Sequence, residues 1–520
     1  MNILSKQKSA DIGLLLEGTF PFVSGGVSSW VNQIIRGFPQ LSFAICFLGS
    51  RPEDYGGMRY ELPENVVHLD VHYLHAPAAS TARPGTRPGD PEVFADIRTL
   101  HDRYRCPAHG SAGDLLQALM HFRREGRYDK EDFLHSLESW NFISDQYRLR
   151  CTDPSFIDYF WTVRIMHAPL WQLMDIAETF IPVKAFHTIS TGYAGFLGAL
   201  LKRQTGNPLL LSEHGIYTKE RKIDLFQAQW IRDNRGVLEK TSVEIAYFRA
   251  LWIRFFEALG RECYHNADRI VSLYEANRQR QIDDGAPEDK TLSIPNGVDL
   301  PRLARLRPSD PAQPPQVVCF IGRVVPIKDV KTFIRAMRTV VNHNPAIQAW
   351  IAGPEDEDPA YARDCRLLAE GLGLEKHVRF LGFQKIDTLL PQVGVLVLSS
   401  ISEALPLVIL EGYAVGVPCV ATDVGSCRQL IEGSDAEDRA LGNAGIVVGI
   451  ADPQALAGAV LTLLTDAARW RDARRAGIAR VERHYTQESM FRRYGVLYTQ
   501  AITRNARCPV NGHATLERSL

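Results

Sequence analysis

Two glutamates, Glu403 and Glu411, bracket an apolar run that opens with Pro406. Proline suits the first turn of a helix, so the stretch predicts a helix over 406–415 with Glu403 in the loop before it. If all eight steps were helical, the carboxylates would lie about 12 Å apart, wider than the roughly 5–9.5 Å of carboxylates that flank one glycosidic bond. The pair therefore fits two ends of an elongated ligand. Two solvated glutamates near a helix start are the simpler alternative.

Cationic and N–H groups lie near these carboxylates in the predicted arrangement. We expect the first N–H groups of the helix, on Leu407, Val408 and Ile409, to be free, and free N–H groups at a helix start favour an anion. Arg323 and Lys328 follow a predicted strand, and together they supply a planar fork and a compact charge, a common pairing on diphosphate. A diphosphate with a polyol on each side would satisfy all of these groups. Alone, such a pair of cations is more often surface charge.

The first half of the chain offers a second set of candidates. Gly25 and Gly26 lie in "LLLEGTFPFVSGGVSSWV", a strand, a loop and a helix start, where glycine lets the backbone approach a ligand closely. The motif is not G-x-G-x-x-G, which disfavours a nicotinamide dinucleotide site. Glu213 and His214 end another predicted strand, where side chains face a ligand crevice, so His214 could bind a sugar hydroxyl near the reacting carbon. An ordinary turn and a structural histidine are the alternatives.

Two further stretches have mainly structural interpretations. The turn "IPNGVDL" (294–300) contains Asn296 and closes the first half. The acidic cluster at 356–358 has the D-x-D spacing of a Mg²⁺ or Mn²⁺ site, but acidic residues also suit the start of a helix. Two cations are already available to neutralise a phosphate, so we predict no metal.

The elements that must position these residues are short apolar runs separated by helix-length segments. Such runs lack polar alternation, which is typical of parallel sheets covered on both faces. The first series of predicted strands covers 11–17, 42–50, 65–71, 184–190, 208–214 and 269–273. The second series covers 316–322, 346–353, 377–382, 393–400, 417–422 and 444–448.

A proline-rich segment at 305–316 separates the two series and predicts a linker. The fold class is therefore α/β, with two doubly wound Rossmann-like domains. The predicted boundaries are 1–300 with insertions at about 75–180 and 218–265, 301–488, a C-terminal helix at 489–507 that packs back on the first domain, and a tail at 508–520.

Composition excludes several classes of protein. The formal net charge of -1 gives no electrostatic case for nucleic acid binding. Nine cysteines without a C-x-x-C pair are typical of free thiols in a reducing compartment. Neither a signal sequence nor a run of about 18 apolar residues occurs, so we expect a cytoplasmic protein that reaches the inner membrane only through partners.

Four stretches together resemble the family 4 retaining glycosyltransferases. They are the "GG" loop, "PNGVD", "GRVVPIKDV" and "EALPLVILE". That family has the GT-B fold, two Rossmann-like domains facing an interdomain cleft. "EGTFPFVSGGVSSWV" and "SEHGIY", with the helical insertions, further resemble the cytosolic glycosyltransferases of bacterial Pel exopolysaccharide synthesis.

The resemblance implies a role for each matching residue. Arg323 and Lys328 would hold the donor diphosphate, Glu411 the ribose hydroxyls, and Glu403 the hydroxyls of the transferred sugar. His214 would lie near the anomeric carbon. Further donor contacts would come from the backbone of Ala404, Leu405, Pro406, Leu407 and Val408, from Phe383 beside the base, and from Gly25 and Gly26 over the phosphates. Such enzymes need no metal and no cofactor besides the UDP-sugar itself.

The expected function is transfer of a hexose from UDP-glucose or a UDP-N-acetylhexosamine to a growing exopolysaccharide. The expected partners are that polysaccharide acceptor and an inner-membrane polysaccharide synthase or export complex. Two alternatives stay open. One is a UDP-sugar 2-epimerase with Glu213 and His214 as its acid/base pair, and the other is a UDP-sugar-binding regulatory subunit of a membrane synthase.

Overall fold

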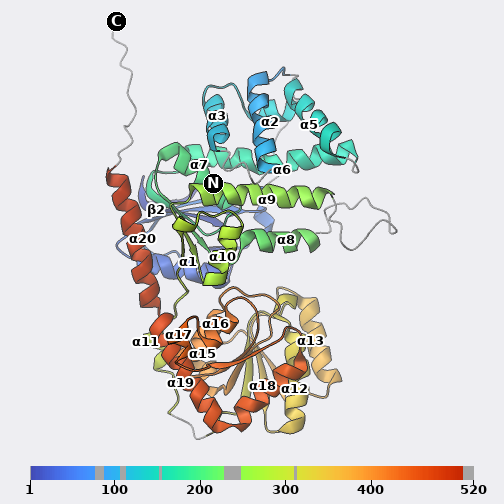
Figure 1. Ribbon diagram of the computed structural model, residues 1–520, viewed down its shortest axis with the longest axis vertical. Helices are drawn as coiled ribbons and strands as arrows, with labels where there is room; N and C mark the ends of the chain where they lie inside the picture. Colours follow the sequence, from blue (N-terminus) through green and yellow to red (C-terminus); the bar gives the residue numbers. More distant parts are fainter. Residues whose placement is uncertain are drawn as a thin grey trace. The chain divides into compact units, whose positions relative to one another are not determined.

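The computed structural model describes residues 2–75, 87–105, 113–151, 155–227, 247–309 and 313–507, which form two compact units (Figure 1). The first unit comprises Met1–Ser272, Asn277–Ser293 and Gly495–Leu520, and the second comprises Leu273–Ala276 and Ile294–Tyr494. Parts of both predicted insertions, part of the predicted linker and the predicted tail lie outside the described residues.

The first unit is built on a sheet with the strand order β1-β4-β3-β2-β5-β6-β7-β8. Its strands are β1 Asn2–Ser5, β2 Ala10–Glu17, β3 Phe43–Gly49, β4 Val66–Tyr73, β5 Val183–Thr188, β6 Leu209–Glu213, β7 Arg269–Ser272 and β8 Thr291–Ser293. β1 pairs antiparallel with β4, and the other neighbouring strands are parallel. After β4 the chain returns to the other side of β2, so the strand order switches between β2 and β5. In doubly wound sheets ligands bind at this switch point.

Helices cover the first sheet, and several more form the insertion. Figure 1 shows α7 and α9 on one side of the sheet and α1 on the other, with α6 beside α7 and with α2, α3 and α5 beyond them. The helices of this half are α1 Gly26–Gly37, α2 Pro91–Arg105, α3 Gly113–Arg124, α4 Lys130–His135, α5 Leu137–Arg150, α6 Phe156–Thr179, α7 Tyr193–Thr205, α8 Tyr217–Gln227, α9 Tyr247–Asn266 and α10 Glu275–Asp283, with 3-10 turns at Pro52–Asp54 and Glu288–Lys290.

The second unit is built on a parallel sheet with the order β11-β10-β9-β12-β13-β14. Its strands are β9 Val317–Ile321, β10 Gln348–Ala352, β11 Val378–Gly382, β12 Val395–Leu398, β13 Cys419–Thr422 and β14 Gly445–Val448. Here the strand order switches between β9 and β12. The helices are α11 Leu300–Ala304, α12 Val330–His343, α13 Pro359–Gly371, α14 Ile386–Leu389, α15 Leu407–Val415, α16 Cys427–Glu432, α17 Ala436–Arg439, α18 Pro453–Thr465 and α19 Ala467–His484, with 3-10 turns at Pro326–Lys328 and Leu390–Gln392.

Both faces of the second sheet are apolar, as the continuous hydrophobic runs predicted. Successive side chains of a strand point to opposite faces, so Val318 and Phe320 of β9 pack in the cluster that contains α12 and α18. Cys319 between them packs with the cluster that contains α15 and α16. A strand buried on both sides cannot carry polar residues on alternate positions, which is why the sequence pattern identifies it.

The prediction of two doubly wound sheets is confirmed, and every predicted strand is present within a residue or two of its expected bounds. The two edge strands of the first sheet, β1 and β8, are short and were not predicted. β8 has three residues, all partly exposed, so it lacks the apolar run that marked the others. The last helix, α20 Gln487–Arg507, contributes Tyr498 to the first unit, where its ring packs on Phe38. No helix in the described ranges is long and apolar enough to span a bilayer.

Candidate functional site

The first candidate region lies at the carboxyl ends of β9, β10 and β11 in the second unit. The loops that follow these strands surround a hollow lined by Arg302, Ile321, Gly322, Arg323, Ala352, Gly353, Pro354, Phe383, Gln384, Lys385, Ile386 and Asp387. Carboxyl ends of parallel strands are the usual place for a ligand in such folds. Phe383, expected beside a nucleotide base, is 79% exposed and forms part of this wall.

Two glycines hold the walls of this hollow close together. Gly353 has φ +156, and a Cβ atom there would lie 1.9 Å from the carbonyl oxygen of Gly322. The N–H of Gly322 donates to the carbonyl of Ala352 at 2.9 Å. The loop that carries Arg323 is therefore fixed against the neighbouring loop by backbone contacts that only glycine permits.

Lys328 and Glu403 meet at the strand-order switch of the second sheet. Lys328 ends the turn after β9, Glu403 follows β12, and the Nζ atom of Lys328 forms an ion pair with Oε1 of Glu403. The hydroxyl of Ser400 donates to the same carboxylate oxygen at 2.6 Å, and that of Ser399 donates to the Lys328 carbonyl at 3.0 Å. The two side chains are 22% and 12% exposed, so this is a partly desolvated pair of opposite charges.

The start of α15 differs from the prediction by one residue. Pro406 is the residue before the helix rather than its first residue, and the helix begins at Leu407. The N–H of Ile409 donates to the carbonyl of Pro406 at 3.2 Å, so the expectation that it is free was wrong. Among the described residues, the N–H groups of Leu407 and Val408 have no backbone acceptor. The anion-favouring end of this helix therefore consists of two donors rather than three.

The peptide segment before α15 is fixed from behind by Gly425. This glycine has φ +54, and a Cβ atom there would lie 2.3 Å from the Glu403 carbonyl oxygen and 2.5 Å from that of Ala404. The N–H of Ser426 donates to the Ala404 carbonyl at 2.9 Å. Leu405 and Pro406 are buried, so the segment has little freedom to move. Gly425 was not among the predicted site residues, although it follows a predicted strand.

The structure does not place Arg323 and Lys328 on the same partner. Both Oε atoms of Glu357 accept from Nη1 of Arg323 at 2.5 Å, and the arginine side chain is 46% exposed. Glu357 follows β10, the strand next to β9, so its carboxylate is within reach of the guanidinium. In this structure each cation therefore holds a different carboxylate, and the expectation that both bind one diphosphate stays a prediction.

The acidic cluster at 356–358 starts a helix, as the simpler interpretation predicted. Asp358 caps α13 by accepting from the N–H of Tyr361 at 2.9 Å, and Glu357 pairs with Arg323. The residues that the structure describes contain no group of three histidine, cysteine or acidic side chains that could hold a metal ion.

Glu411 lies on α15, and its carboxyl interacts electrostatically with Arg302 and Asp387, which line the hollow. Burial raises the pKa of the Glu411 carboxyl to about 7, with Arg302 opposing the shift and Asp387 adding to it. Arg302 and Asp387 form an ion pair with each other on the wall of the hollow. A carboxyl held near neutrality by burial next to a cavity is a frequent feature of ligand-binding sites.

The second candidate region is a pocket of about 350 Å³ at the strand-order switch of the first sheet. It contains the ends of β2 and β6 and the loop after β5. Its lining includes Glu17, Gly18, Thr19, Ser50, Tyr55, His75, Ser190, Tyr193, Glu213, His214, Tyr217, Glu220 and Arg221. The volume is in the range of small-molecule sites.

His214 lies in this pocket with its Nε2 atom unpaired among the described residues. The imidazole is 7% exposed and packs edge-on against Trp30, with ring centroids 4.6 Å apart. Burial lowers the pKa of His214 to about 4, so the ring is neutral at physiological pH. A neutral imidazole with one nitrogen available can hydrogen-bond a ligand hydroxyl.

Glu213 has a different environment from the one that the epimerase alternative requires. Its carboxylate accepts from Thr191 Oγ1 at 3.1 Å, Tyr217 N at 3.0 Å, Tyr264 Oη at 2.8 Å and Gln281 Nε2 at 3.0 Å. Because a carboxylate offers about four acceptor sites, this set saturates it. Glu213 lines the pocket but acts as a buried anchor, and the structure gives no support to its expected role as a substrate-binding group or a base.

Glu17, Tyr217 and Arg221 form a polar group in the same pocket that sequence reasoning missed. The Tyr217 hydroxyl donates to Glu17 Oε1 at 3.0 Å, and Nη2 of Arg221 donates to the Tyr217 hydroxyl at 2.9 Å. The N–H of Ala194 donates to Glu17 Oε2 at 3.2 Å. Glu17 ends a predicted strand, the same signal that identified Glu213, so it could have been found. Arg221 lies in a stretch assigned to an insertion and gave no signal.

Two other predicted site regions, the loop with Gly25 and Gly26 and the turn with Asn296, contribute no predicted residue to the lining of either candidate region. Gly25 and Gly26 are exposed at the start of α1, and a Cβ atom on either would meet nothing within 4 Å. Asn296 is buried, with its Oδ1 unpaired among the described residues. A Cβ atom on Gly297 would lie 2.4 Å from the Thr486 backbone, so this turn closes tightly on the chain before α20.

Two family models match the chain. The first, described as a domain of unknown function (DUF3492), matches residues 10–289, and the second, described as glycosyl transferases group 1, matches residues 315–466. Among curated proteins, the D-inositol 3-phosphate glycosyltransferase of Geodermatophilus obscurus is 33% identical over 199 residues, covering 34% of this chain and 44% of its own length. That of Thermomonospora curvata is 30% identical over 263 residues, covering 45% and 57%. The chain spans about half the length of the curated relatives it matches.

Solved structures with the same architecture include the Anabaena protein HepE in complex with UDP, with a TM-score of 0.55, 14% identity and coverage of 94% of this chain and 100% of that one. Sucrose-phosphate synthase from Thermosynechococcus elongatus has a TM-score of 0.55, 17% identity and coverage of 95% and 100%. These likenesses confirm the expected GT-B fold. The chain belongs to the family described as a domain of unknown function (DUF3492), and its second unit carries a glycosyl transferases group 1 domain.

Proposed function

We propose that this protein is a retaining glycosyltransferase that transfers a hexose from a UDP-sugar to a growing exopolysaccharide. The observation that carries the proposal is the ion pair of Lys328 and Glu403 at the strand-order switch of the second sheet, beside the two donors at the start of α15. Lys328 is suited to a phosphate oxygen, and Glu403 is suited to the hydroxyls of a sugar attached to that phosphate. Glu411, on the same helix beside the hollow with Phe383, suits the ribose hydroxyls.

The chemistry of this arrangement is electrostatic. When the bond between the sugar and the diphosphate breaks, negative charge grows on the leaving phosphate oxygen. The Lys328 ammonium and the N–H groups of Leu407 and Val408 would stabilise that charge, an effect worth about 3–4 kcal/mol for a single well-placed donor. The leaving phosphate then takes the proton of the acceptor hydroxyl on the same face of the sugar, so no protein nucleophile is needed and the anomeric configuration is retained.

Arg323 joins this site only after leaving Glu357. An exposed ion pair contributes about 0.2–1 kcal/mol, whereas a charge-assisted hydrogen bond to a ligand contributes about 1.5–3 kcal/mol. It is therefore favourable for Arg323 to release the Glu357 carboxylate and bind a diphosphate oxygen instead. His214, neutral and with Nε2 available, would hold a hydroxyl of the sugar or of the acceptor.

The finer assignment to Pel-type exopolysaccharide synthesis rests on the motifs "EGTFPFVSGGVSSWV" and "SEHGIY" and on the helical insertion of the first unit. We extend the proposal to an inner-membrane synthase or export complex as the partner. UDP is the nucleotide bound by the structural relative HepE, and the curated relatives are named as glycosyltransferases, which supports a nucleotide-sugar donor of this class.

The test is incubation of the purified chain with UDP-glucose, UDP-N-acetylglucosamine or UDP-N-acetylgalactosamine, with and without oligosaccharide acceptors. Release of UDP with a new glycosidic bond of the donor's anomeric configuration, read by NMR, supports the proposal. Conversion of a UDP-N-acetylhexosamine to its 2-epimer without an acceptor would show an epimerase instead. Binding of a UDP-sugar without turnover, whichever acceptor is present, would favour a regulatory subunit.

A further inference from the structure

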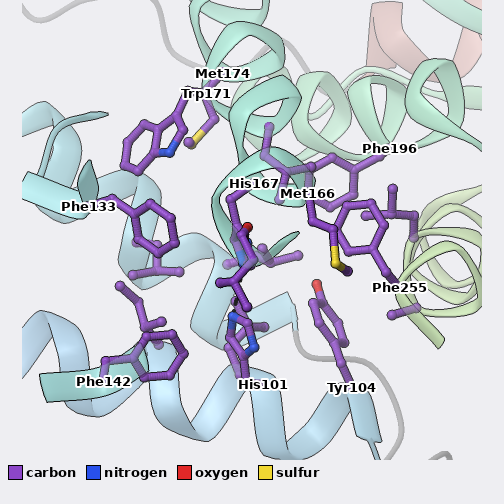
Figure 2. A pocket seen from close by; sticks show the side chains of 18 of the residues that line it. His101, Tyr104, Phe133, Phe142, Met166, His167, Trp171, Met174, Phe196 and Phe255 are labelled. Carbon is purple, nitrogen blue, oxygen red and sulfur yellow. Dashed lines mark hydrogen bonds between the residues drawn. The ribbon is translucent and has the colours of Figure 1, made fainter. Parts of the chain in front are cut away.

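The helical insertion of the first unit encloses a cavity that the proposed transfer reaction does not use. Helices α2, α3, α5, α6, α7 and α9 contribute to its wall, and it shares no lining residue with the pocket that contains His214. Figure 2 shows that aromatic rings and thioethers point into it, among them Phe133, Phe142, Trp171, Phe196, Met166 and Met174. The wall is thus mostly apolar.

The cavity has the size of a small ligand. Its volume is about 140 Å³, close to the engineered apolar cavity of about 150 Å³ that binds benzene in another protein. Close-packed protein interiors leave few voids larger than a water molecule. Leu251 and Leu170, on two different helices of the wall, are partly exposed, so parts of the wall lie at the protein surface. A space of this kind suits an apolar body of about six heavy atoms.

One edge of the cavity is polar. The Tyr104 hydroxyl has no hydrogen-bond partner among the described residues, and Figure 2 shows it directed toward Met166. His101 and His167 stack and contact each other through their Nε2 atoms at 3.1 Å, and Nδ1–H of His167 donates to the Val163 carbonyl at 2.7 Å. The histidines therefore satisfy each other, whereas the tyrosine hydroxyl is left to a ligand.

Two arginines, Arg105 and Arg254, line the same cavity. Within the part of the chain that the structure describes neither forms an ion pair, and Arg105 has a side-chain hydrogen bond with Tyr159, a neutral partner. Burial, together with repulsion from Arg150 and Arg254, lowers the pKa of Arg105. Arg150 already pairs with Asp102 at 2.6 Å, so the charges of Arg105 and Arg254 are the ones not matched by a carboxylate. Buried or half-buried charges are normally paired, which makes an anion the expected complement.

We propose that this cavity binds a small amphipathic carboxylate, with its apolar body among the aromatic side chains and its carboxylate on Arg105 and Arg254. The planar guanidinium fork matches a carboxylate, and the Tyr104 hydroxyl can donate to one of its oxygens. A sugar would leave its hydroxyls unpaired against the aromatic wall, and an uncharged hydrocarbon would leave the arginines unmatched. The cavity shares no lining residue with either candidate region, so such a ligand would act on the enzyme without taking part in transfer.

The test uses the full chain and 3-phenylpropanoate, with the uncharged 3-phenylpropan-1-ol as the matched probe, in isothermal titration calorimetry. We expect one binding site for the carboxylate, and affinity at least tenfold weaker for the alcohol because it lacks the charge-assisted bonds. Arg254→Gln should weaken carboxylate binding about tenfold and leave alcohol binding unchanged. Arg148→Gln, at an exposed arginine of α5 outside the cavity, is the control and should change neither.

A cavity-filling variant, Leu251→Phe, locates the site. It should abolish binding of both probes, with thermal unfolding confirming that the variant is folded. Equal affinity for the acid and the alcohol, carboxylate binding that survives both variants, or no heat for either probe with the unaltered chain would each overturn the proposal. UDP binding, followed in the same samples, is expected to be unchanged, so failure here is distinguishable from failure of the proposed transferase function.

Discussion

The Nζ atom of Lys328 and the Oε1 atom of Glu403 form an ion pair although the two residues are 75 positions apart in the chain. Their strands, β9 and β12, are neighbours at the place where the strand order of the second sheet reverses. The pair is largely screened from solvent and is supported by the Ser400 hydroxyl. Removal of either charge alone leaves the other partly buried without a partner, which is unfavourable.

The first prediction is that Lys328 and Glu403 act as a unit. Lys328→Met and Glu403→Gln should each lower kcat/KM by about 10²–10³, and the double variant should lose little more than the worse single one, because residues that act together are non-additive. Lys331→Met is the control, since its ammonium pairs with the exposed carboxylate of Asp364. Steady-state kinetics with UDP release as the readout measures this. The prediction would be contradicted if the fold-loss in kcat/KM of the double variant equalled the product of the two single fold-losses.

The second prediction concerns the competition between Glu357 and a diphosphate for Arg323. Glu357→Gln should free the guanidinium and lower the KM for the donor by up to about fivefold, since an exposed ion pair is worth about 0.2–1 kcal/mol. Arg323→Gln should raise the KM and lower kcat. Glu355→Gln, which removes a neighbouring acidic residue that pairs with Arg366 instead, is the matched control. If neither Glu357→Gln nor Arg323→Gln changes the affinity for the donor, Arg323 lies outside the donor site.

The sequence predicted the sheets well because burial on both faces leaves a direct signature in the residues. It also predicted that Lys328 and Glu403 belong to one site, since both follow strand-like runs and such residues gather at one edge of a parallel sheet. It could not predict the partner of Arg323. Glu357 was visible as an acidic residue after a strand, but strand order, which places β10 beside β9, is a property of the fold.

Glu213 shows a second limit of sequence reasoning. Its position at a strand end suggested chemistry, and Glu17 at another strand end carried the same signal. What separates them is the number of donors around each carboxylate, and those of Glu213 come from Thr191, Tyr217, Tyr264 and Gln281, on separate elements. Saturation of a carboxylate is a tertiary property that no local pattern encodes.

The third prediction is that His214 acts as a neutral hydrogen-bonding group. Because burial lowers its pKa to about 4, titration of His214 should cause no change in kcat/KM between pH 5.5 and 8. His214→Phe keeps an aromatic ring against Trp30 but removes the nitrogen, and we expect a loss of about tenfold in kcat/KM, the value of one hydrogen bond. His121→Phe, at an exposed histidine on α3, is the control. A profile that falls with a midpoint near pH 6.5 and flattens in His214→Phe would contradict a neutral role.

The fourth prediction links Glu411 to both stability and binding. Its pKa of about 7 in the folded protein lies above the ordinary value of 4.5, so the folded state holds this proton more tightly than the unfolded state. The resulting stabilisation is fully present below pH 4.5 and is lost as the pH rises through 7. The loss is on the order of 2 kcal/mol for a partly buried carboxyl.

Glu411→Gln removes this titration, so the variant should gain stability relative to the unaltered protein at pH 8 and not at pH 4.5. Urea unfolding at the two pH values measures the difference. The same substitution should weaken UDP binding, because an amide is a poorer acceptor than a carboxylate for the ribose hydroxyls. In the unaltered protein, UDP affinity should rise between pH 6 and 8 as Glu411 loses its proton, and Glu411→Gln should flatten this rise. Glu432→Gln, at a more exposed glutamate of the same unit that pairs with Arg428, is the control. A stability difference between Glu411→Gln and the unaltered protein that is equal at both pH values would show that Glu411 is not held near neutrality by burial, and the basis for its role beside the nucleotide would be lost.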